Sequence, residues 1–281
     1  MSQLNGRTHS YHAEANVLQG HFRLPLVQEI KPQAYAKLSE EGGYLAQHPC
    51  DYRLESVLTI RSAYTQVAGN QDVKPGHGWS TLATSVVEGL NVLDVVTADR
   101  VVAQISTEHP LVGYVPKISF LGTRFENLRI SGHPVELDLD PEILGPKPDN
   151  DAPYTTNPDL VSRVARQHSQ VKTHPNLLAG LIQRYTAPPA ATPNPEAVEC
   201  SLVNQATGTF PGRCFGHVIE VPGFGTIVLA ALRLEHSDFQ AASGIPKCTT
   251  TRLSMIELKM GCVAEGTAQI AQAHTNGGTR P

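Results

Sequence analysis

Twelve histidines make metal binding the first chemistry to consider in this chain. His9, His12 and His21 lie close together near the N-terminus and could form a metal site. However, a β-strand would place His9 and His12 on opposite faces, so shared ligation would need a turn between them. Neither H-E-x-x-H nor H-x-H occurs, which removes the stronger metallohydrolase patterns. We therefore interpret these three as surface or hydrogen-bonding histidines, with the metal site as the alternative.

Nucleophilic catalysis has only weak support in the sequence. The G-x-S-x-G motif is absent, but Ser80 follows His77 within a glycine-containing stretch. A catalytic triad depends on geometry in the fold, so this pair remains an alternative. The favoured interpretation is a turn in which Trp79 anchors the core. The run Glu235-His236-Ser237-Asp238 contains all three triad residue types, but neighbours on a strand point to opposite faces, which favours a polar strand end.

Two acidic groups and one glycine turn are further candidates for ligand sites. Carboxylates that could hold calcium occur at Asp138, Asp140 and Glu142, and at Asp149 and Asp151. The second group lacks the glycine and the terminal glutamate of an EF-hand, so a solvated surface is favoured for both. The turn at 222–226 is followed by a strand, so it offers no helix N-terminus for phosphate and is predicted to be a hairpin turn. We predict no catalytic, cofactor-binding or metal-binding residues.

The five cysteines form no C-x-x-C pair, so no zinc or thioredoxin-like motif is indicated. They are Cys50, Cys200, Cys214, Cys248 and Cys262. Such scattered cysteines are typical of small buried hydrophobic side chains. A disulfide between Cys200 and Cys214, facing each other across a hairpin, is the alternative.

The composition favours a β protein and argues against several function classes. Hydrophobic residues make up 40% of the 281 residues, enough for a packed core, whereas only 17% are charged. With 23 glycines and 21 prolines the chain is rich in turn formers. The formal net charge of −4 and the lack of a basic run predict no nucleic-acid binding. No apolar run approaches the roughly 20 residues of a transmembrane helix.

Alternation of polar and apolar residues predicts strands on both sides of a central segment. The first half shows it at 10–17, 52–64, 79–106, 118–121, 125–130 and 135–139, with breaks expected near Glu88-Gly89 and at 97–99. Ser131-Gly132 is a hairpin signal. The second half shows alternation at 198–202, 217–221, 226–236, 252–260 and 263–270. We predict a mainly β, antiparallel β-sandwich or barrel-like domain. A β-solenoid is the alternative, because 85–92 and 123–130 share a short strand pattern.

The central segment differs, because proline-rich stretches bound two helical patterns. Asn157 followed by Pro158 is a good helix start. A second helix is predicted to start at Thr173 or His174 and to continue to Tyr185. Residues 1–140 and 196–281 are thus predicted to form one β domain, with 141–195 as Pro-rich linkers and a two-helix insertion.

Several of these strands resemble those of the bacterial choice-of-anchor P family domain. The resemblance lies in 10–18, 83–106, 125–135, 221–229 and 253–258, in the family's order. It implies a repetitive β architecture that is exported and attached to the cell surface, with no established activity or catalytic residues. The polar N-terminus, which has no hydrophobic signal segment, indicates instead a cytoplasmic location. The location is therefore left open.

The leading functional prediction is a non-enzymatic structural protein that assembles with itself, such as a filament, sheath or surface-layer subunit. Many short strands, low charge and the lack of a catalytic motif support it. The first alternative is a binding module that recognises a glycan or a protein through its loops. Exposed aromatic side chains at Tyr114, Tyr154 or Phe224 would support that alternative. The second alternative is a hydrolase whose site brings together His9, His12, His21 or His77.

Overall fold

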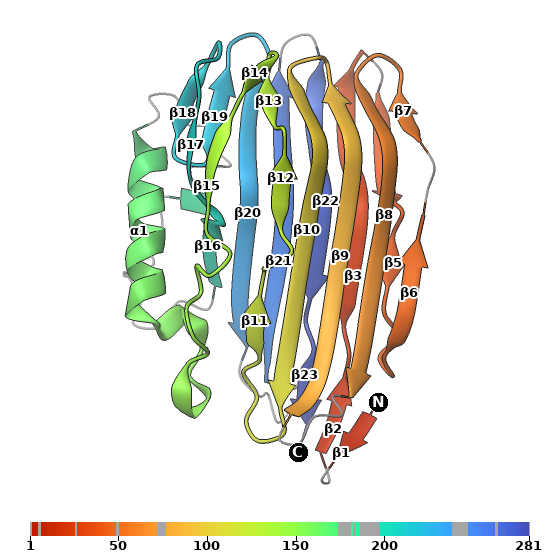
Figure 1. Ribbon diagram of the computed structural model, residues 1–281, viewed down its shortest axis with the longest axis vertical. Helices are drawn as coiled ribbons and strands as arrows, with labels where there is room; N and C mark the ends of the chain where they lie inside the picture. Colours follow the sequence, from red (N-terminus) through yellow and green to blue (C-terminus); the bar gives the residue numbers. More distant parts are fainter. Residues whose placement is uncertain are drawn as a thin grey trace.

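The fold is a two-layer antiparallel β-sandwich (Figure 1). The computed structural model describes residues 2–4, 7–25, 27–48, 51–71, 77–173, 181, 184–185, 197–237, 247–261 and 264–280. The larger layer, sheet A, contains β1 (Ser2–Leu4), β2 (Arg7–Ser10), β3 (Ala13–Leu24), β4 (Gln28–Gln33), β5 (Ala36–Lys37), β16 (Ala197–Ser201), β18 (Arg213–Phe215), β19 (Val218–Val221), β20 (Gly225–Ser237), β21 (Cys248–Gly261), β22 (Glu265–Thr275) and β23 (Gly278–Arg280).

The second layer, sheet B, is built on three long strands that follow one another in the chain. It contains β6 (Gly43–Gln47), β7 (Tyr52–Leu54), β8 (Leu58–Gln71), β9 (His77–Val92), β10 (Val96–Pro110), β11 (Lys117–Ser119), β12 (Arg124–Glu126), β13 (Arg129–Ile130) and β14 (His133–Pro134). A two-stranded sheet pairs β15 (Glu136–Leu139) with β17 (Val203–Thr207). Every strand pairing described is antiparallel, so the β-solenoid alternative is wrong.

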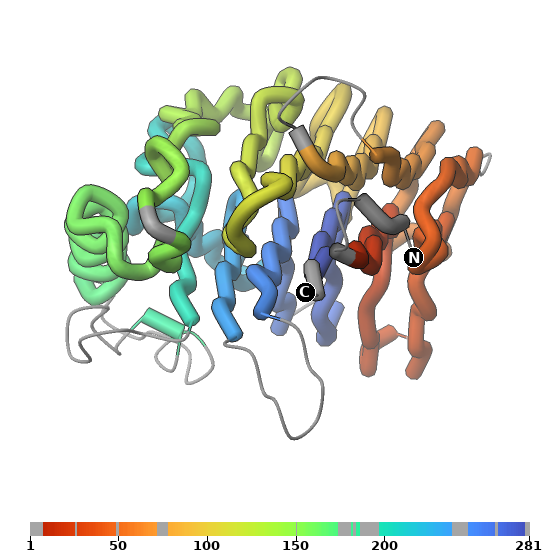
Figure 2. The backbone as a smooth tube through the Cα atoms, turned by 90° about the horizontal axis from the view of Figure 1, so that it is seen from below, coloured from red at the N-terminus to blue at the C-terminus, as the bar shows by residue number. Residues whose placement is uncertain are grey.

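The two layers pack face to face around one apolar core (Figure 2). In sheet A the long strands run in the order β20, β21, β22, β3, and in sheet B in the order β10, β9, β8. Burying apolar side chains from both inner faces is the main favourable contribution to such a fold. β2 and β23 pair with each other at the end of the sandwich where both termini lie.

The helical part of the chain flanks one side of the sandwich. It comprises two 3₁₀ turns, η1 (Asp149–Asp151) and η2 (Tyr154–Thr156), and the helix α1 (Pro158–Lys172). The predicted helix start is confirmed, because the Asn157 side chain accepts a hydrogen bond from the Asp159 backbone N–H. Of the predicted second helix, Leu181, Arg184 and Tyr185 are described and helical, and its other positions lie outside the described residues. No helix within the described ranges has both the length and the apolar character needed to cross a membrane.

The strand boundaries correct two expectations and confirm others. β9 continues through Gly89, which adopts a positive φ of 62° within the strand, so the expected break there is wrong. β10 likewise continues through 97–99, and the chain reverses instead at Leu93-Asp94, where both φ angles are positive as a tight hairpin requires. The hairpin turn at Ser131-Gly132 is confirmed, as is the turn between β19 and β20.

In each of four neighbouring strands of sheet A, the alternation of inward and outward side chains shifts once by one residue. Two consecutive residues in each strand are fully buried: Val17 and Leu18, Ile270 and Ala271, Met255 and Ile256, Leu229 and Ala230. Their positions match across the strands, since Leu18 pairs with Ile270 and Ile256 with both Ile270 and Leu229. Ala230 and Ala271 have positive φ angles at this row. As a result, outward positions three residues apart, such as Asn16 and Gln19, share the outer face.

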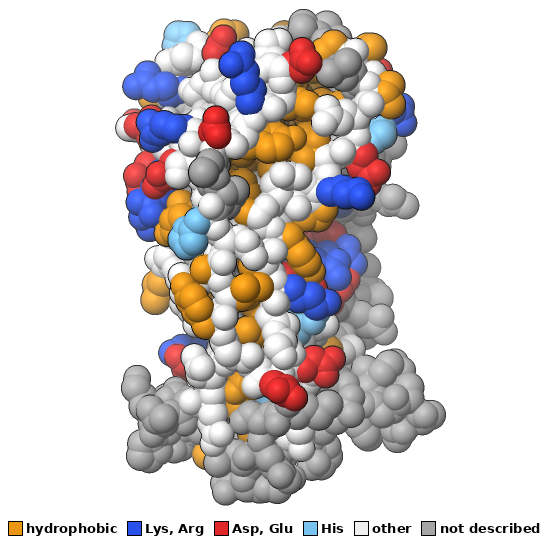
Figure 3. All heavy atoms as spheres, turned by 90° about the vertical axis from the view of Figure 1, so that its right-hand side faces the viewer, with side chains coloured by type: hydrophobic (Ala, Val, Ile, Leu, Met, Phe, Trp, Pro, Cys, Tyr) orange, Lys and Arg blue, Asp and Glu red, His pale blue; other side chains and the backbone are white. Residues whose placement is uncertain are grey.

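One side of the sandwich carries a group of exposed apolar side chains (Figure 3). It is formed by the end of β3 and by β4, β5 and β6. Of the seven large hydrophobic side chains exposed in the described residues, five lie here: Leu24, Val27, Tyr35, Tyr44 and Leu45. β6 pairs only with β8, so its other edge is unpaired within the described part of sheet B.

Candidate functional site

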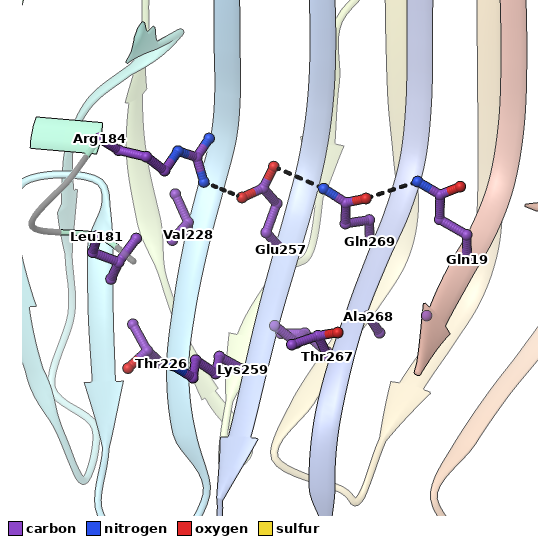
Figure 4. Close-up of a pocket in the computed structure, with 12 residues that line it drawn as sticks. Gln19, Leu181, Arg184, Thr226, Val228, Glu257, Lys259, Thr267, Ala268 and Gln269 are labelled. Carbon is purple, nitrogen blue, oxygen red and sulfur yellow. Dashed lines mark hydrogen bonds and ion pairs between the residues drawn. The ribbon is translucent and has the colours of Figure 1, made fainter. Parts of the chain in front are cut away.

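The outer face of sheet A, which points away from sheet B, is hollowed into two adjoining pockets. One has a volume of about 590 Å³ and the other about 400 Å³. They share the side chains of Gln19, Arg184, Glu257 and Gln269, which form the boundary between them (Figure 4). We call the two pockets together the outer groove. Each lies within the size range of small-molecule sites in proteins.

A row of six polar side chains crosses the outer face of sheet A, and its four central members line the larger pocket. Strand register places its members directly beside one another, because side chains opposite each other in an antiparallel pair are close neighbours. In order they are Lys37, Glu14, His274, Arg252, Arg233 and Glu199. Five of these six groups carry a formal charge at neutral pH, so this row can bind charged and hydrogen-bonding ligand groups.

Arg184 links this row to the boundary between the pockets. Its Nε donates to Glu199 Oε2 over 2.6 Å and its Nη1 to Glu257 Oε2 over 2.5 Å. Burial alone would lower the pKa of Arg184, but Tyr185, Glu257 and Glu199 outweigh it and raise that pKa. Gln269 Nε2 donates to Glu257 Oε1 over 3.3 Å, and Gln19 Nε2 donates to Gln269 Oε1 over 2.7 Å. The groove therefore has an ordered hydrogen-bonded boundary.

Three oxygen atoms on the floor of the larger pocket lack hydrogen-bond partners within the described residues. They are Asn16 Oδ1, Gln272 Oε1 and Ser254 Oγ. Register places these residues side by side, Asn16 opposite Gln272 and Gln272 opposite Ser254. Ser254 is only 6% exposed. Buried polar atoms normally have partners, so this row of three is a candidate place for a ligand or water to bind.

Arg252 is a cation on the floor of the larger pocket that has no ion-pair partner among the described residues. Its side chain is exposed, and in the described part of the chain it makes no ion pair or hydrogen bond. In contrast, Arg233 pairs with Glu235 and with Glu199. A guanidinium without a carboxylate partner suits an anionic ligand group.

The structure separates the three histidines proposed as a metal site. His9 is fully buried inside the sandwich, whereas His12 and His21 are on its outside. His21 lies nine residues beyond His12 along the strand, about 30 Å at the usual rise per residue. His12 is instead adjacent to Glu14 and His274, and one ligand atom from each of these three lies within 4.8 Å of the others.

His9 belongs to an aromatic cluster at the end of the sandwich. Its ring stacks on Trp79 at 5.0 Å between centroids and lies 4.5 Å from the ring of His109. Burial lowers the pKa of His9 to about 2 and that of His109 to about 4. His109 Nε2 is 3.0 Å from the Gly277 carbonyl, which accepts its hydrogen. This position suits packing of neutral rings. Trp79 is confirmed as a core anchor, but it lies in the strand β9 and not in the predicted turn.

The described members of the two proposed catalytic groups have other partners. Ser80 Oγ donates to the Asn70 carbonyl, and the His77 side chain lies outside the described residues. Ser237 Oγ contacts Cys248 Sγ at 2.9 Å, and Glu235 pairs with Arg233. Asp238 lies outside the described residues. The prediction of a polar strand end fits these contacts.

Three of the five acidic side chains, those of Asp138, Asp140 and Asp151, have protein partners. Asp138 accepts from Asn204, and Asp140 pairs with Arg163 at 2.8 Å. The backbone N–H of Glu142 donates to Asp140. Asp151 Oδ1 accepts from the backbone N–H groups of Tyr114 and Val115, which fixes a loop. Asp149 begins the 3₁₀ turn η1.

The disulfide alternative and two of the aromatic expectations are wrong, whereas Cys200 is buried as predicted. Cys200 and Cys214 are free thiols, because β16 pairs with β20 while β18 pairs with β19. Burial raises the pKa of Cys200 to about 12, which makes it unreactive. Tyr154 and Phe224, proposed as exposed loop aromatics, are buried at 1% and 4% exposure. Tyr154 donates its hydroxyl to the Pro116 carbonyl.

Sequence reasoning missed the residues of the outer groove. Glu14, Arg252 and His274 come from three strands, and only the register of sheet A makes them neighbours. A usable signal was the spacing in β22, where Gln269, Gln272 and His274 interrupt an otherwise apolar run. The two glutamines are three positions apart, and this spacing indicates that the alternation of inward and outward side chains changes between them.

The fold and the groove define an antiparallel β-sandwich protein with a polar groove on the outer face of its larger sheet. Residues 9–235 match the family described as a domain of unknown function, DUF8256, and the chain belongs to that family. No curated protein matches the chain, and no solved structure matches it.

Proposed function

We propose that the protein is a binding module whose outer groove takes a polyhydroxylated ligand with a single acid group, such as an acidic saccharide. The observation that carries the proposal is the row of unpartnered oxygens of Asn16, Gln272 and Ser254 next to the unpaired Arg252. Amide oxygens accept hydrogen bonds from ligand hydroxyls, and a guanidinium pairs with a carboxylate.

The surrounding charges favour one acid group over a polyanion. Glu14, Glu199, Glu235 and Glu257 lie in or beside the groove and would repel further negative charge. Tyr35, 42% exposed, stands at the rim of the larger pocket, where its ring can contact the face of a sugar. This proposal places recognition on a sheet face and not on the loops.

The test compares uronic-acid oligosaccharides with their carboxyl-reduced counterparts in direct binding measurements. The wild-type protein should prefer the acidic form. Arg252→Ala should weaken binding of the acidic form about 10- to 100-fold, because a hydrogen bond to a charged group typically contributes that much to affinity. The same change should hardly affect the reduced form. Arg129→Ala, an exposed arginine of sheet B, is the matched control. The proposal would be refuted if the wild-type protein bound the acidic and the reduced sugars equally well and Arg252→Ala changed neither affinity.

A second candidate function is self-assembly through the exposed side of the sandwich. The concentration of exposed apolar side chains along β3–β6 supports it, as does the sequence of β6, which contains no charge or proline. The occupant would be the same edge of a second copy. Light scattering across a wide concentration range should show association that Leu45→Lys abolishes, with Leu121→Lys, an exposed leucine between β11 and β12, as control. A monomer at all concentrations would reject this candidate.

A further inference from the structure

Two histidines and one glutamate meet at the edge of the outer groove. Glu14 lies in β3 directly opposite His274 of β22, and His12 precedes Glu14 by two residues. The His12 carbonyl accepts a hydrogen bond from the Asn276 backbone N–H, which holds the chain before β3 against the chain after β22. Backbone pairing thus brings the three side chains together.

Their ligand atoms are close enough to share one ion. His12 Nε2 is 3.3 Å from Glu14 Oε1, and His274 Nδ1 is 3.8 Å from Glu14 Oε2. A tetrahedral zinc ion with bonds of 2.0–2.2 Å separates its ligand atoms by about 3.4 Å. Small side-chain rotations would therefore suffice. Nε2 of His12 and Nε2 of His274 have no hydrogen-bond partner in the described residues.

The protonation states suit metal binding. Burial lowers the pKa of His12, and it lowers that of His274 to about 4, so both rings are neutral at pH 7. Burial works to raise the pKa of Glu14, but the hydrogen bond from Tyr35 and the nearby His12 and Lys37 lower it overall. A neutral imidazole pair and a carboxylate are ligands that need no proton release at this pH.

We propose that His12, Glu14 and His274 bind a divalent transition-metal ion of the zinc class. The two nitrogen ligands and one oxygen ligand favour zinc, cobalt or copper over magnesium or calcium, which prefer all-oxygen sites. Three protein ligands leave the fourth position of a tetrahedral ion for water or a ligand group.

Two neighbouring cationic side chains would repel a metal ion, and this repulsion gives a further test of the proposal. Lys37 Nζ lies 3.3 Å from Glu14 Oε1, and Arg252 is opposite His274 in the sheet. The Lys37 side chain is 56% exposed, so it can move into solvent when an ion binds. Removing its charge should therefore tighten metal binding several-fold.

The experiment titrates tag-free protein with Zn²⁺ by calorimetry and records the visible spectrum with Co²⁺. We expect one saturable Zn²⁺ per chain and the absorption of tetrahedral cobalt. His12→Ala and His274→Ala should each weaken binding by at least about 100-fold, above the 10- to 100-fold loss typical of outer-shell partners. Glu14→Gln should also weaken it, whereas Lys37→Ala should strengthen it. His21→Ala, an exposed histidine on the same strand, should change nothing.

No saturable binding by the wild-type chain would overturn the inference, as would equal affinity in wild type and in folded His12→Ala and His274→Ala variants. Circular dichroism identifies variants that fail to fold, and Lys37→Ala then supplies an independent test, since its exposed side chain is not needed for the core. The inference does not depend on the saccharide proposal. If the protein bound Zn²⁺ but not uronic acids, the metal-site inference would still hold and only the saccharide proposal would fail.

Discussion

His12 follows His9 by three positions in the chain, yet His9 lies inside the sandwich and His12 on its outside. His9 is enclosed with Trp79 and His109 between the sheets, whereas His12 is part of the outer cluster with Glu14 and His274. Both regions contain two imidazoles about 5 Å apart, 4.5 Å inside and 5.1 Å outside.

The difference lies in what surrounds the rings. Inside, the neighbours are aromatic rings and the close-packed Gly277, whose added Cβ would lie 3.0 Å from His109 and 3.2 Å from His9. Outside, the neighbours are Glu14, Lys37 and Arg252, beside a groove open to ligands. The same residue type thus contributes packing in one region and, in our proposal, metal ligands in the other.

The largest effect should come from breaking the inner cluster. Trp79 is 1% exposed, so Trp79→Ala should lower the free energy of unfolding by about 3–5 kcal/mol, the range for large aromatic truncations. His12→Ala, at the outer cluster, should cost less than about 1 kcal/mol. Urea denaturation of both variants measures the contrast. Similar losses would show that the outer cluster also supports the fold.

Acid should affect the two regions through their neutral histidines. The folded protein holds the pKa of His9 at about 2 and those of His109 and His274 at about 4, below the ordinary 6.5. The unfolded chain therefore binds more protons below pH 6.5, and stability falls as pH drops from 6.5 towards 4. Each group adds a slope of up to about 1.4 kcal/mol per pH unit.

The variant His109→Gln tests this assignment. It should lower stability at pH 7 but reduce the slope between pH 6.5 and pH 4, as measured by denaturation at several pH values. His133→Ala, an exposed histidine, serves as the control and should leave the slope unchanged. An unaltered slope in His109→Gln would mean that other groups cause the acid sensitivity.

An intermediate effect is expected from the boundary of the outer groove. Arg184→Ala leaves Glu257 without its cation and Glu199 without one of its two, at a half-buried location. We expect a loss of about 1–3 kcal/mol, between the values for exposed and buried ion pairs. Thermal and urea unfolding measure it. A loss below about 0.5 kcal/mol would show that the groove boundary is not part of the stable fold.

The smallest effects should come from buried hydroxyls on the two faces of β21. Thr251 points inward and Ser254 outward, and neither hydroxyl has a hydrogen-bond partner in the described residues. Thr251→Val and Ser254→Ala should be neutral or stabilising by up to about 1 kcal/mol, because each removes an unpaired polar group. Thr65→Val, which loses a 2.6 Å hydrogen bond to the Ala34 carbonyl, should instead cost about 1 kcal/mol. Destabilisation by Thr251→Val would reveal a bound water.

The assembly hypothesis and the choice-of-anchor P resemblance stay predictions. Membership of the DUF8256 family assigns no activity, so the outer groove and the exposed side of the sandwich define what to test.

The sequence by itself determined the class of fold and several local structures. Alternation of polar and apolar residues is a local property of each strand, and it predicted an antiparallel β fold. Local capping at Asn157 and the turn at Ser131-Gly132 were also predictable, since they depend on residues a few positions apart.

Only the tertiary structure decided which residues form the groove. Glu14 and His274 are 260 positions apart and meet because β3 pairs with β22. The matched change of phase in four strands also turns Gln19 outward, which no single strand pattern reveals. Register between distant strands is set by packing of the whole core, and for that reason the metal and ligand chemistry could not be read from spacing along the chain.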